Sequence, residues 1–342
     1  AKIRAARLVW AKIVEANGCK DIENSKINMH CETSQWNKTV YDPYVNMLRV
    51  TTEAMSAILG GTNSLSVIPF DYSFGEPTDF SLRIAKNVQL IIKEEAHFGK
   101  VIDPAAGSYY IENLTDLVIE KAWNLFLKVD EIGGFTEAVK TGFIQDNINE
   151  TAKLRNSNIA SRREIILGVN QYPNFNEVIT GVNISEKQNL GDGQFKTISL
   201  YRASEEFEKL RLITDKSKKR PKVFMLTIGN LNFRKARAQF SCNFFACAGF
   251  EVIDNNGFEN IDEGLKVAKA NNADIIVLCS SDEEYETLAP ETLEKAGGTI
   301  LVIAGNPACR ADLENKGIKN FIHVKSNVLE ELRGYQKQLG IN

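Results

Sequence analysis

The chain has 342 residues, of which 43% are hydrophobic and 25% are charged, and its formal net charge is -3 at pH 7. This length allows two or three domains of ordinary size, and the slight acidity disfavours a role in binding nucleic acid. No apolar run approaches the ~20 residues of a transmembrane helix, and no signal peptide is evident. We therefore expect a cytoplasmic protein, or one of the mitochondrial matrix if the source is eukaryotic.

The predicted elements of residues 1 to about 114 alternate between strand and helix. The chain opens in an amphipathic segment, and a short strand carries His30. Asp42 stands before Pro43, which predicts the N-cap and the first turn of a helix. This helix is expected to end at Gly60-Gly61, because glycine adopts a left-handed cap without steric cost. Its expected inward residues are Met47, Leu48, Met55, Ile58 and Leu59.

A second strand is predicted at residues 64–68, followed by a helix with Ile84, Val88 and Ile91 on one face. Such alternation is typical of parallel sheets that are covered by helices. The sequence that follows is helix-rich and then polar. Its basic end, residues 215–222, is interpreted as a solvated linker, because no aromatic residues interleave with its charges.

Residues 221–342 alternate more regularly. A helix is predicted at residues 238–249, and the last helix shows a helical period in Val328, Leu332 and Tyr335. Parallel strands joined by right-handed helical crossovers are the expected arrangement. The sequence therefore predicts a flavodoxin-like, doubly wound domain. Its strands are expected at residues 223–228, 250–253, 273–279, 298–304 and 321–324.

Doubly wound sheets bind ligands at the carboxyl ends of their strands, so the loops after the first, third and fourth strands form the candidate site. These loops contain residues 229–237, 279–281 and 305–306. Aligned on residues 248–252, they resemble the cobalamin-binding domain of methylmalonyl-CoA mutases, whose signature is Asp-x-His-x-x-Gly, then Ser-x-Leu, then Gly-Gly. The resemblance implies that the His binds cobalt, the Asp orients its imidazole and the small residues line a slot for the nucleotide tail.

The match to this signature mostly fails. The family's Asp falls on Asn232, its His on Arg234 and its Gly on Arg237, and a register shifted by two puts the His position on Asn232. Neither register supplies an imidazole, and a guanidinium has no lone pair to give to a metal. We therefore expect a domain that binds no metal and no cofactor, with adenosylcobalamin held by a partner subunit. The degenerate cofactor positions are Asn232, Arg234, Arg237, Ser281, Gly305 and Asn306, of which Gly305 keeps the family residue.

The first part of the chain contains five segments that match the same family in order and spacing, at residues 2–7, 29–36, 60–65, 77–81 and 102–110. They resemble the last third of the mutase substrate barrel. A closed (β/α)8 barrel needs eight strand and helix units, and about three precede the helical stretch here. We therefore expect a partial barrel, in a piece that lacks the N-terminal half and leaves sheet edges to be covered by something else.

This resemblance also implies where catalytic groups would lie, since barrel enzymes place them at the carboxyl ends of strands. Active members carry a Gln two residues after the His that matches His30, and an Asn and a Glu after the strand that matches residues 64–68. The corresponding residues here are Glu32, Ile68 and Tyr72. A carboxylate thus replaces an amide, and Ile68 offers no hydrogen bond. We expect no catalytic residue, and His30 is interpreted as a packed structural residue.

The six cysteines show neither a CxxC nor the paired spacing of metal ligands, so we expect free thiols in a reducing compartment. Cys242 and Cys247 fall on adjacent turns of a predicted helix and are expected to face the core. The others are Cys19, Cys31, Cys279 and Cys309.

The patterns together predict a partial barrel at residues 1–114, a helical linker at 115–220 and a degenerate cobalamin-binding-like domain at 221–342. The resemblance implies a non-catalytic small subunit of a heterodimeric mutase, which stabilises a large subunit that interconverts methylmalonyl-CoA and succinyl-CoA. Two alternatives stay open. The flavodoxin-like domain could bind another anionic ligand, through the basic residues 234–237, or serve as a regulatory module, and the chain could be a catalytic mutase with an unusual site.

Overall fold

The computed structural model describes residues 1–179 and 195–341. The chain divides into two compact units, one of residues 1–153 and 185–202 and the other of residues 154–184 and 203–342. Both units combine helices with parallel strands, so the α/β class expected from the sequence is confirmed. The domain boundaries expected near residues 114 and 220 stay a prediction. Within the described ranges, no helix is both long and apolar enough to cross a membrane.

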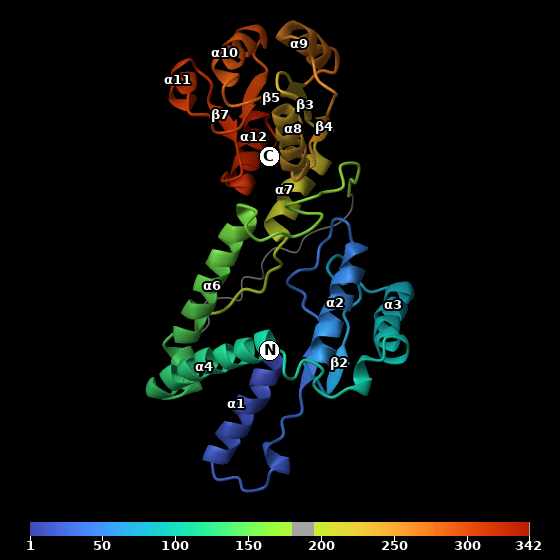
Figure 1. Cartoon of the computed structure of the whole chain (residues 1–342), viewed down its shortest axis with the longest axis vertical. Helices are drawn as coiled ribbons and strands as arrows, with labels where there is room; N and C mark the ends of the chain where they lie inside the picture. The colour runs from blue at the N-terminus through green and yellow to red at the C-terminus, as the bar shows by residue number, and fades with distance from the viewer. Residues whose placement is uncertain (180–194, 342) are drawn as a thin grey trace. The chain divides into compact units, whose positions relative to one another are not determined.

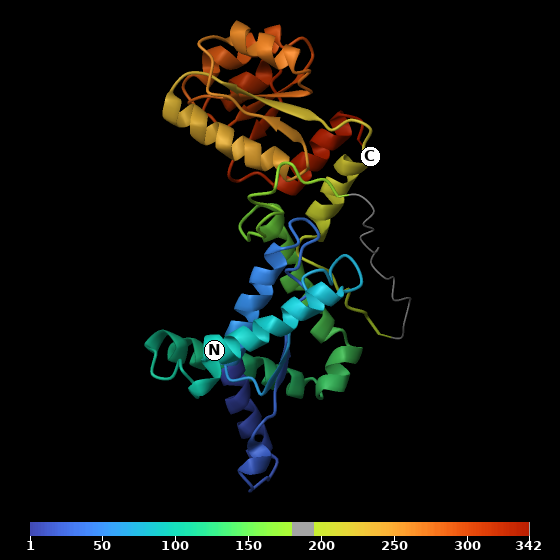
Figure 2. The same cartoon turned by 90° about the vertical axis from the view of Figure 1, so that its right-hand side faces the viewer.

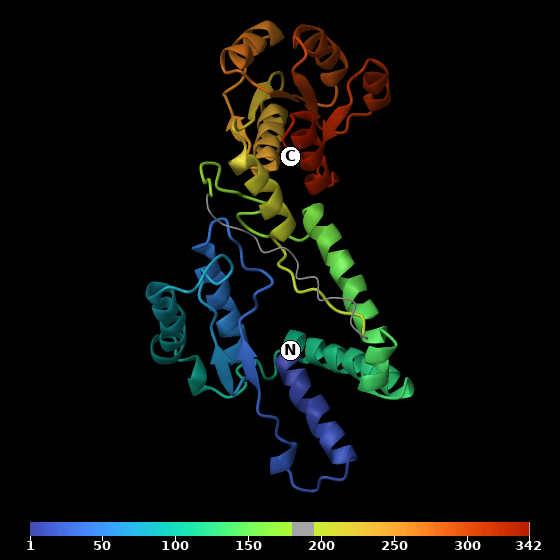
Figure 3. The same cartoon turned by 180° about the vertical axis from the view of Figure 1, so that it is seen from behind.

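The first unit places one pair of parallel strands beside helices (Figures 1 and 3). Strand β1 (His30–Glu32) pairs with β2 (Ser64–Ser66), with His30 opposite Ser64. An apolar cluster of Ala54, Val88 and Ile92 is buried in this unit. The other elements are α1 (Lys2–Ala16), η1 (Glu23–Ser25), α2 (Val45–Leu59), α3 (Asp79–Leu90), η2 (Ile91–Glu95), η3 (Phe98–Lys100), α4 (Tyr109–Glu131) and α5 (Phe135–Lys140), and α6 (Phe143–Ala160) continues into the second unit.

Helix α2 differs from the sequence expectation at its start and on its buried face. Its N-cap is Tyr44, and the predicted cap at Asp42 is wrong. Asp42 instead has a left-handed φ of 50°, and its carbonyl accepts from Val45 N at 3.1 Å, so the main chain closes this turn. The left-handed C-terminal glycine is confirmed at Gly61. Small and branched residues allow α3 to approach, so the buried face consists of Asn46, Val50, Ala54 and Ala57.

Two of the residues expected on that inward face point elsewhere, while others pack as expected. Leu48 is 66% exposed and Leu59 is 36% exposed, so both predictions are wrong. Met55 and Ile58 pack against the buried cluster that contains Ala54. The hydrophobic residues of α2 are therefore spread over more than one face of the helix.

The buried face of α3 differs from the expected one at its C-terminal end. Val88 is buried as expected, but Ile91 is 49% exposed and its neighbour Ile92 is 3% exposed. Ala85, Val88 and Ile92 are spaced three and four residues apart, so they share one helical face, and Ile91 lies to the side of it. The prediction for Ile91 is therefore wrong.

The second unit is built on a five-stranded sheet in the order β4-β3-β5-β6-β7, in which every pairing is parallel. All five expected strands are present, with ends that agree within two residues. The strands are β3 (Lys222–Thr227), β4 (Glu251–Ile253), β5 (Ile275–Cys279), β6 (Ile300–Ala304) and β7 (Asn320–Ile322). The helices are α7 (Glu205–Lys216), α8 (Leu231–Ala246), α9 (Ile261–Ala270), α10 (Tyr285–Lys295), α11 (Arg310–Asn315) and α12 (Val328–Gln338).

Helices cover both faces of this sheet, with α8 along one face and α9 and α10 beyond the other (Figure 2). Phe224 of β3 shares one apolar cluster with Tyr285 of α10. On the α8 side, the ring of Phe245 lies 6.1 Å from that of Phe250 and 5.3 Å from that of Tyr335 in α12. Coverage on both faces explains why the central strands are apolar at nearly every position.

Helix α8 begins well before the position expected from the sequence. Its N-cap is Asn230, whose side-chain oxygen accepts from the backbone N–H groups of Asn232 at 3.1 Å and Phe233 at 3.4 Å. The expected loop at residues 229–237 is therefore wrong, because asparagine caps the helix almost directly after the strand. As a result, Arg234 and Arg237 extend from the first two turns of α8.

Candidate functional site

The paired strands of the first unit bring His30 between two serines. His30 Nδ1 lies 2.8 Å from Ser64 Oγ, and His30 Nε2 lies 3.2 Å from Ser66 Oγ. A neutral imidazole has one donor and one acceptor nitrogen, and a hydroxyl serves either, so both ring nitrogens have a partner. His30 is nevertheless exposed, so the expectation of a packed residue is wrong, and its structural role stays a prediction.

The positions named as degenerate, where active members of the family carry polar groups, lie at and beyond the ends of these strands. Glu32 ends β1 and is exposed, while Ile68 is 6% exposed and its N–H donates to Thr33 Oγ1 at 2.9 Å. Tyr72 is 49% exposed and lies in the turn that follows, where its N–H donates to Pro69 O at 3.2 Å. The structure thus brings Glu32 and Ile68 to neighbouring strand ends and leaves Tyr72 further along the chain.

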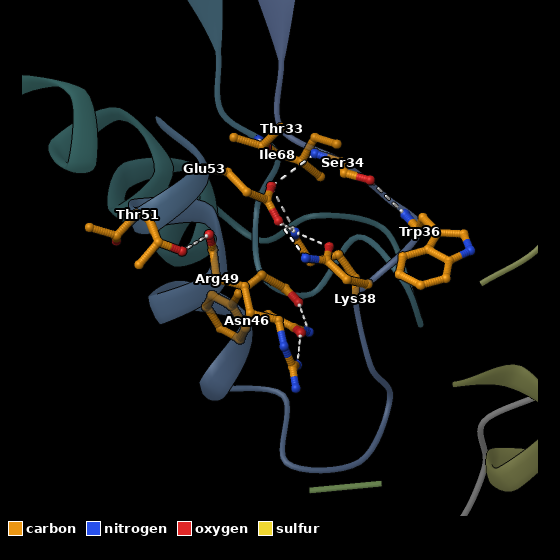
Figure 4. A network of polar contacts seen from close by, with 12 residues as sticks. Thr33, Ser34, Trp36, Lys38, Asn46, Arg49, Thr51, Glu53 and Ile68 are labelled. Atoms are coloured by element: carbon orange, nitrogen blue, oxygen red, sulfur yellow. Dashed lines mark hydrogen bonds and ion pairs between the residues drawn. The ribbon is translucent and has the colours of Figure 1, made fainter. Parts of the chain in front are cut away.

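A buried ion pair that sequence reasoning missed lies beside this strand end (Figure 4). The Lys38 side chain is 1% exposed, and its Nζ lies 2.8 and 3.1 Å from the two carboxylate oxygens of Glu53 on α2. Glu53 also accepts from Ser34 N at 2.9 Å and from Asn37 Nδ2 at 2.7 Å. Burial lowers the pKa of Lys38, and its bonds to Glu53 oppose that shift. The loop after β1 is therefore held against α2.

Asn46 makes a second attachment between this loop and α2. Its Oδ1 accepts from Thr39 N at 3.1 Å and from Arg49 at 2.7 Å, and its Nδ2 donates to Thr39 O at 2.8 Å and Phe70 O at 3.0 Å. Asn46 is fully buried and stands seven residues before Glu53, so both lie on one helical face (Figure 4). The sequence offers little signal for this pair, because α2 also contains Arg49, Thr51, Thr52 and Ser56.

The carboxyl edge of the five-stranded sheet is the second candidate site, and Arg237 fills part of it. Arg237 Nη2 lies 2.8 Å from Asp282 Oδ1 in the loop after β5. A Cβ atom added to Gly305, after β6, would lie 2.7 Å from Arg237 Nη1. The arginine therefore occupies the space beside the glycine that keeps the family residue.

Arg234 fills the neighbouring side of the same edge. Its Nη1 donates to Gly229 O at 3.4 Å and its Nη2 to Asn256 O at 3.1 Å. Gly257 has a φ of 112°, and a Cβ atom there would lie 2.5 Å from the Arg234 guanidinium carbon. Arg234 also borders an open pocket, which is lined by Gly229, Arg234, Gly257, Phe258, Glu259 and Glu263.

Three further degenerate cofactor positions, Asn232, Asn306 and Ser281, lie at this edge of the sheet. Asn232 is exposed in the first turn of α8, and Asn306 Oδ1 accepts from Arg310 Nη1 at 3.0 Å. Ser281 Oγ donates to Glu284 at 2.8 Å. Four donors in all bind this carboxylate and lower the pKa of Glu284 to about 2, the largest contribution coming from Ser280. The sequence did not single out Glu284, because an acidic residue directly before a helix is common and predicts only an N-terminal cap.

Three of the four cysteines in the second unit are shielded from solvent. Cys242, Cys247 and Cys279 are buried, as expected for the first two, and burial raises the pKa of each, to about 12 for Cys242. Across residues 1–179 and 195–341, no three or more His, Cys, Asp and Glu side chains are grouped so as to hold a metal ion.

A family model described as methylmalonyl-CoA mutase matches residues 1–236. The chain belongs to the methylmalonyl-CoA mutase family. The matched range includes the polar network of the first unit and the start of α8, whereas β4 to β7 lie beyond it.

Curated relatives match more of the chain than this family model does. The methylmalonyl-CoA mutase small subunit of Porphyromonas gingivalis is 53% identical over 347 residues, covering 100% of this chain and 56% of that protein. The small subunit of Streptomyces virginiae is 34% identical over 313 residues, covering 89% of this chain and 50% of that protein. The large subunit of P. gingivalis is 45% identical over 172 residues, covering 50% of this chain and 24% of that protein. The chain spans about half the length of the curated small subunits that it matches.

Proposed function

We propose that this chain is part of the non-catalytic small subunit of a heterodimeric, adenosylcobalamin-dependent methylmalonyl-CoA mutase. In this proposal the first unit corresponds to part of a (β/α)8 barrel, and residues 221–342 form a flavodoxin-like domain that has lost its cofactor. The large subunit interconverts methylmalonyl-CoA and succinyl-CoA, and this chain stabilises it by packing against it. Two findings on relatives support the pairing, because P. gingivalis has both a protein named small subunit and one named large subunit.

The observation that carries the proposal is that charged side chains of the chain itself fill the carboxyl edge of the five-stranded sheet. Arg237 lies against Gly305, and Arg234 stands where the family's resemblance puts the cobalt-binding His. The residues present do not fit cobalamin, since a guanidinium offers no lone pair to a metal. None of the chain's histidines directly follows β3, where the resemblance places the cobalt ligand, since His30 and His97 lie in the first unit and His323 follows β7.

The first unit supports the same proposal. A mutase site needs polar groups at the strand ends that hold the acyl-CoA carbonyl and carboxylate, and Ile68 supplies an apolar side chain there. Glu32 adds a negative charge at the neighbouring position, which disfavours a substrate carboxylate. Folding and pairing do not depend on these groups, so a surface for a partner can persist after a pocket is lost.

The alternative of an anionic ligand at residues 234–237 has less support. Arg234 already donates to two backbone carbonyls, and Arg237 is paired with Asp282. An added anion would approach guanidinium groups that these partners already hold in place, and the buried Arg234 nitrogen that lacks a partner among the described residues is Nε.

A visible-spectrum titration with adenosylcobalamin tests the proposal. The chain alone should leave the cofactor spectrum unchanged and should not retain the cofactor on gel filtration. The large subunit of the same organism should bind the cofactor, and adding this chain should raise the thermal midpoint of that subunit. A base-off spectrum with the isolated chain would overturn the proposal and make it a cofactor carrier, and a large subunit that neither binds nor is stabilised by the chain would overturn the pairing.

A further inference from the structure

The loops after β3 and β5 direct four hydrogen-bond donors at one carboxylate oxygen atom, and we call the space between these donors the pocket. Glu284 Oε2 accepts from Ser281 N at 3.1 Å, from Ser281 Oγ at 2.8 Å, from Asn230 N at 3.4 Å and from Ser280 Oγ. Ser280 is fully buried and Ser281 is 7% exposed. The two N–H groups belong to residues that precede α8 and α10, so two separate loops converge on a single carboxylate oxygen.

Gly229 leaves room for this carboxylate. Its φ is 80°, and a Cβ atom there would lie 2.3 Å from either oxygen of Glu284. A side chain at this position would strain the backbone, and the Glu284 carboxylate would have to shift from its present place. The loop after β3 is thus shaped around Glu284 and contributes a donor from the next residue.

The pocket lies where doubly wound sheets hold ligands, between two central strands at their carboxyl ends. β3 and β5 pair directly, with Thr227 opposite Cys279. Asp282, in the same loop as the two serines, is paired with Arg237, so Glu284 is the acid of this loop that enters the pocket. Converging hydroxyl and N–H donors are the groups with which proteins bind a small oxyanion.

We infer that this edge of the sheet is an oxyanion pocket whose resident ligand is the chain's own Glu284 carboxylate, and that the emptied pocket takes a small free carboxylate. The inference deepens the proposed function and rests on it in one respect, namely that no cofactor competes for the edge. It explains how the loops stay ordered there, since an internal anion supplies the contacts that an external ligand supplies elsewhere.

The test is chemical rescue of a Glu284→Ala variant of the full chain. Its thermal midpoint should lie below that of the original chain and should rise to saturation as formate or acetate is added at constant ionic strength. The original chain and the neighbouring control, Glu283→Ala, should show no such rise, because Glu283 is exposed. A rise that chloride reproduces equally, or an unchanged midpoint in Glu284→Ala, would show that Glu284 is only a helix cap. A rise with phosphate alone would also contradict the assignment, since it would indicate a phosphate site.

A second variant covers the case in which Glu284→Ala does not fold. Glu284→Gln keeps the size of the side chain and removes its charge. The folded-state pKa of Glu284 is lowered from 4.5 to about 2, so the stability that the charge contributes is present above pH 4.5 and is lost as the pH falls toward 2. The midpoint difference between the original chain and Glu284→Gln should therefore be largest above pH 4.5 and shrink below it. A difference that does not depend on pH would overturn the inference.

These outcomes are distinguishable from those of the proposed function. Cobalamin binding by the original chain, read from the visible spectrum, would remove the cofactor-free premise whatever the anions do. A negative cobalamin titration together with absent carboxylate rescue would leave the subunit assignment standing and remove the oxyanion pocket alone.

Discussion

Two buried tyrosines of the second unit differ in what their hydroxyl groups contact. Tyr285 Oη donates to Ala304 O at 2.7 Å and accepts from Ser280 N at 3.1 Å. Tyr335 is 1% exposed, and its Oη has no hydrogen-bond partner among the described residues. An unpaired buried hydroxyl has lost its water without compensation, whereas a paired one stabilises the fold.

We therefore expect opposite results from the same substitution at these sites. Tyr335→Phe should leave the free energy of unfolding unchanged or raise it by about 1 kcal/mol, because its ring contact with Phe245 survives. Tyr285→Phe should lower it by about 1 to 3 kcal/mol, because Ala304 O and Ser280 N lose a partner. Urea denaturation of both variants measures the difference, and a loss at Tyr335 as large as that at Tyr285 would reveal a partner for its hydroxyl.

The buried ion pair of the first unit gives a second residue-scale prediction. Lys38→Met should lower the free energy of unfolding by about 2 to 4 kcal/mol, because it leaves the Glu53 carboxylate partly buried without its cation. Lys93→Met is the matched control, since Lys93 pairs with Glu94 but is 76% exposed, and surface pairs contribute about 0 to 1 kcal/mol. Equal effects in the two variants would mean that water solvates Lys38.

At the scale of elements, the start of α8 can be tested through its cap. Asn230→Ala removes the side-chain oxygen that accepts from Asn232 N and Phe233 N, and caps of this kind contribute about 1 kcal/mol. Asn232→Ala serves as the control, because its side chain is exposed in the first turn. Thermal denaturation should show a clear loss for Asn230→Ala and almost none for the control. If both variants matched the original chain, the helix would start later than Asn230.

Some elements of the fold could be predicted from sequence patterns, and the start of α8 could not. The strands were predictable because each is a continuous apolar run between charged helices, as a strand covered on both faces must be. The start of α8 was not, because Arg234, Lys235 and Arg237 make its first turns as polar as a loop. The end of α3 was missed for another reason, since Ile91 and Ile92 are adjacent apolar residues and each fits a helical period that includes Val88.

At the scale of the whole molecule, the sequence could locate the candidate site but could not predict which side chains pair with one another. The topology rule brings Arg237, Ser281 and Gly305 to one sheet edge, although they are far apart in the chain. The carboxylate that fills this edge stayed hidden, because Glu284 differs in no local pattern from an acid that caps a helix. Lys38 and Glu53 stayed hidden as well, since their pairing follows from how a loop folds back on α2.

The six cysteine thiols lie in both units and differ in their exposure to solvent. Cys242, Cys247 and Cys279 are buried, and burial raises their pKa values, so at pH 8 they are protonated and shielded from reagents. Cys19, Cys31 and Cys309 are partly exposed. A thiol-reactive dye should therefore label at most three groups quickly in the native chain and six in denaturant. Cys19→Ser should lower both counts by one and Cys242→Ser only the denatured count. More than three fast thiols in the native chain would mean that the core around α8 opens on the time scale of labelling.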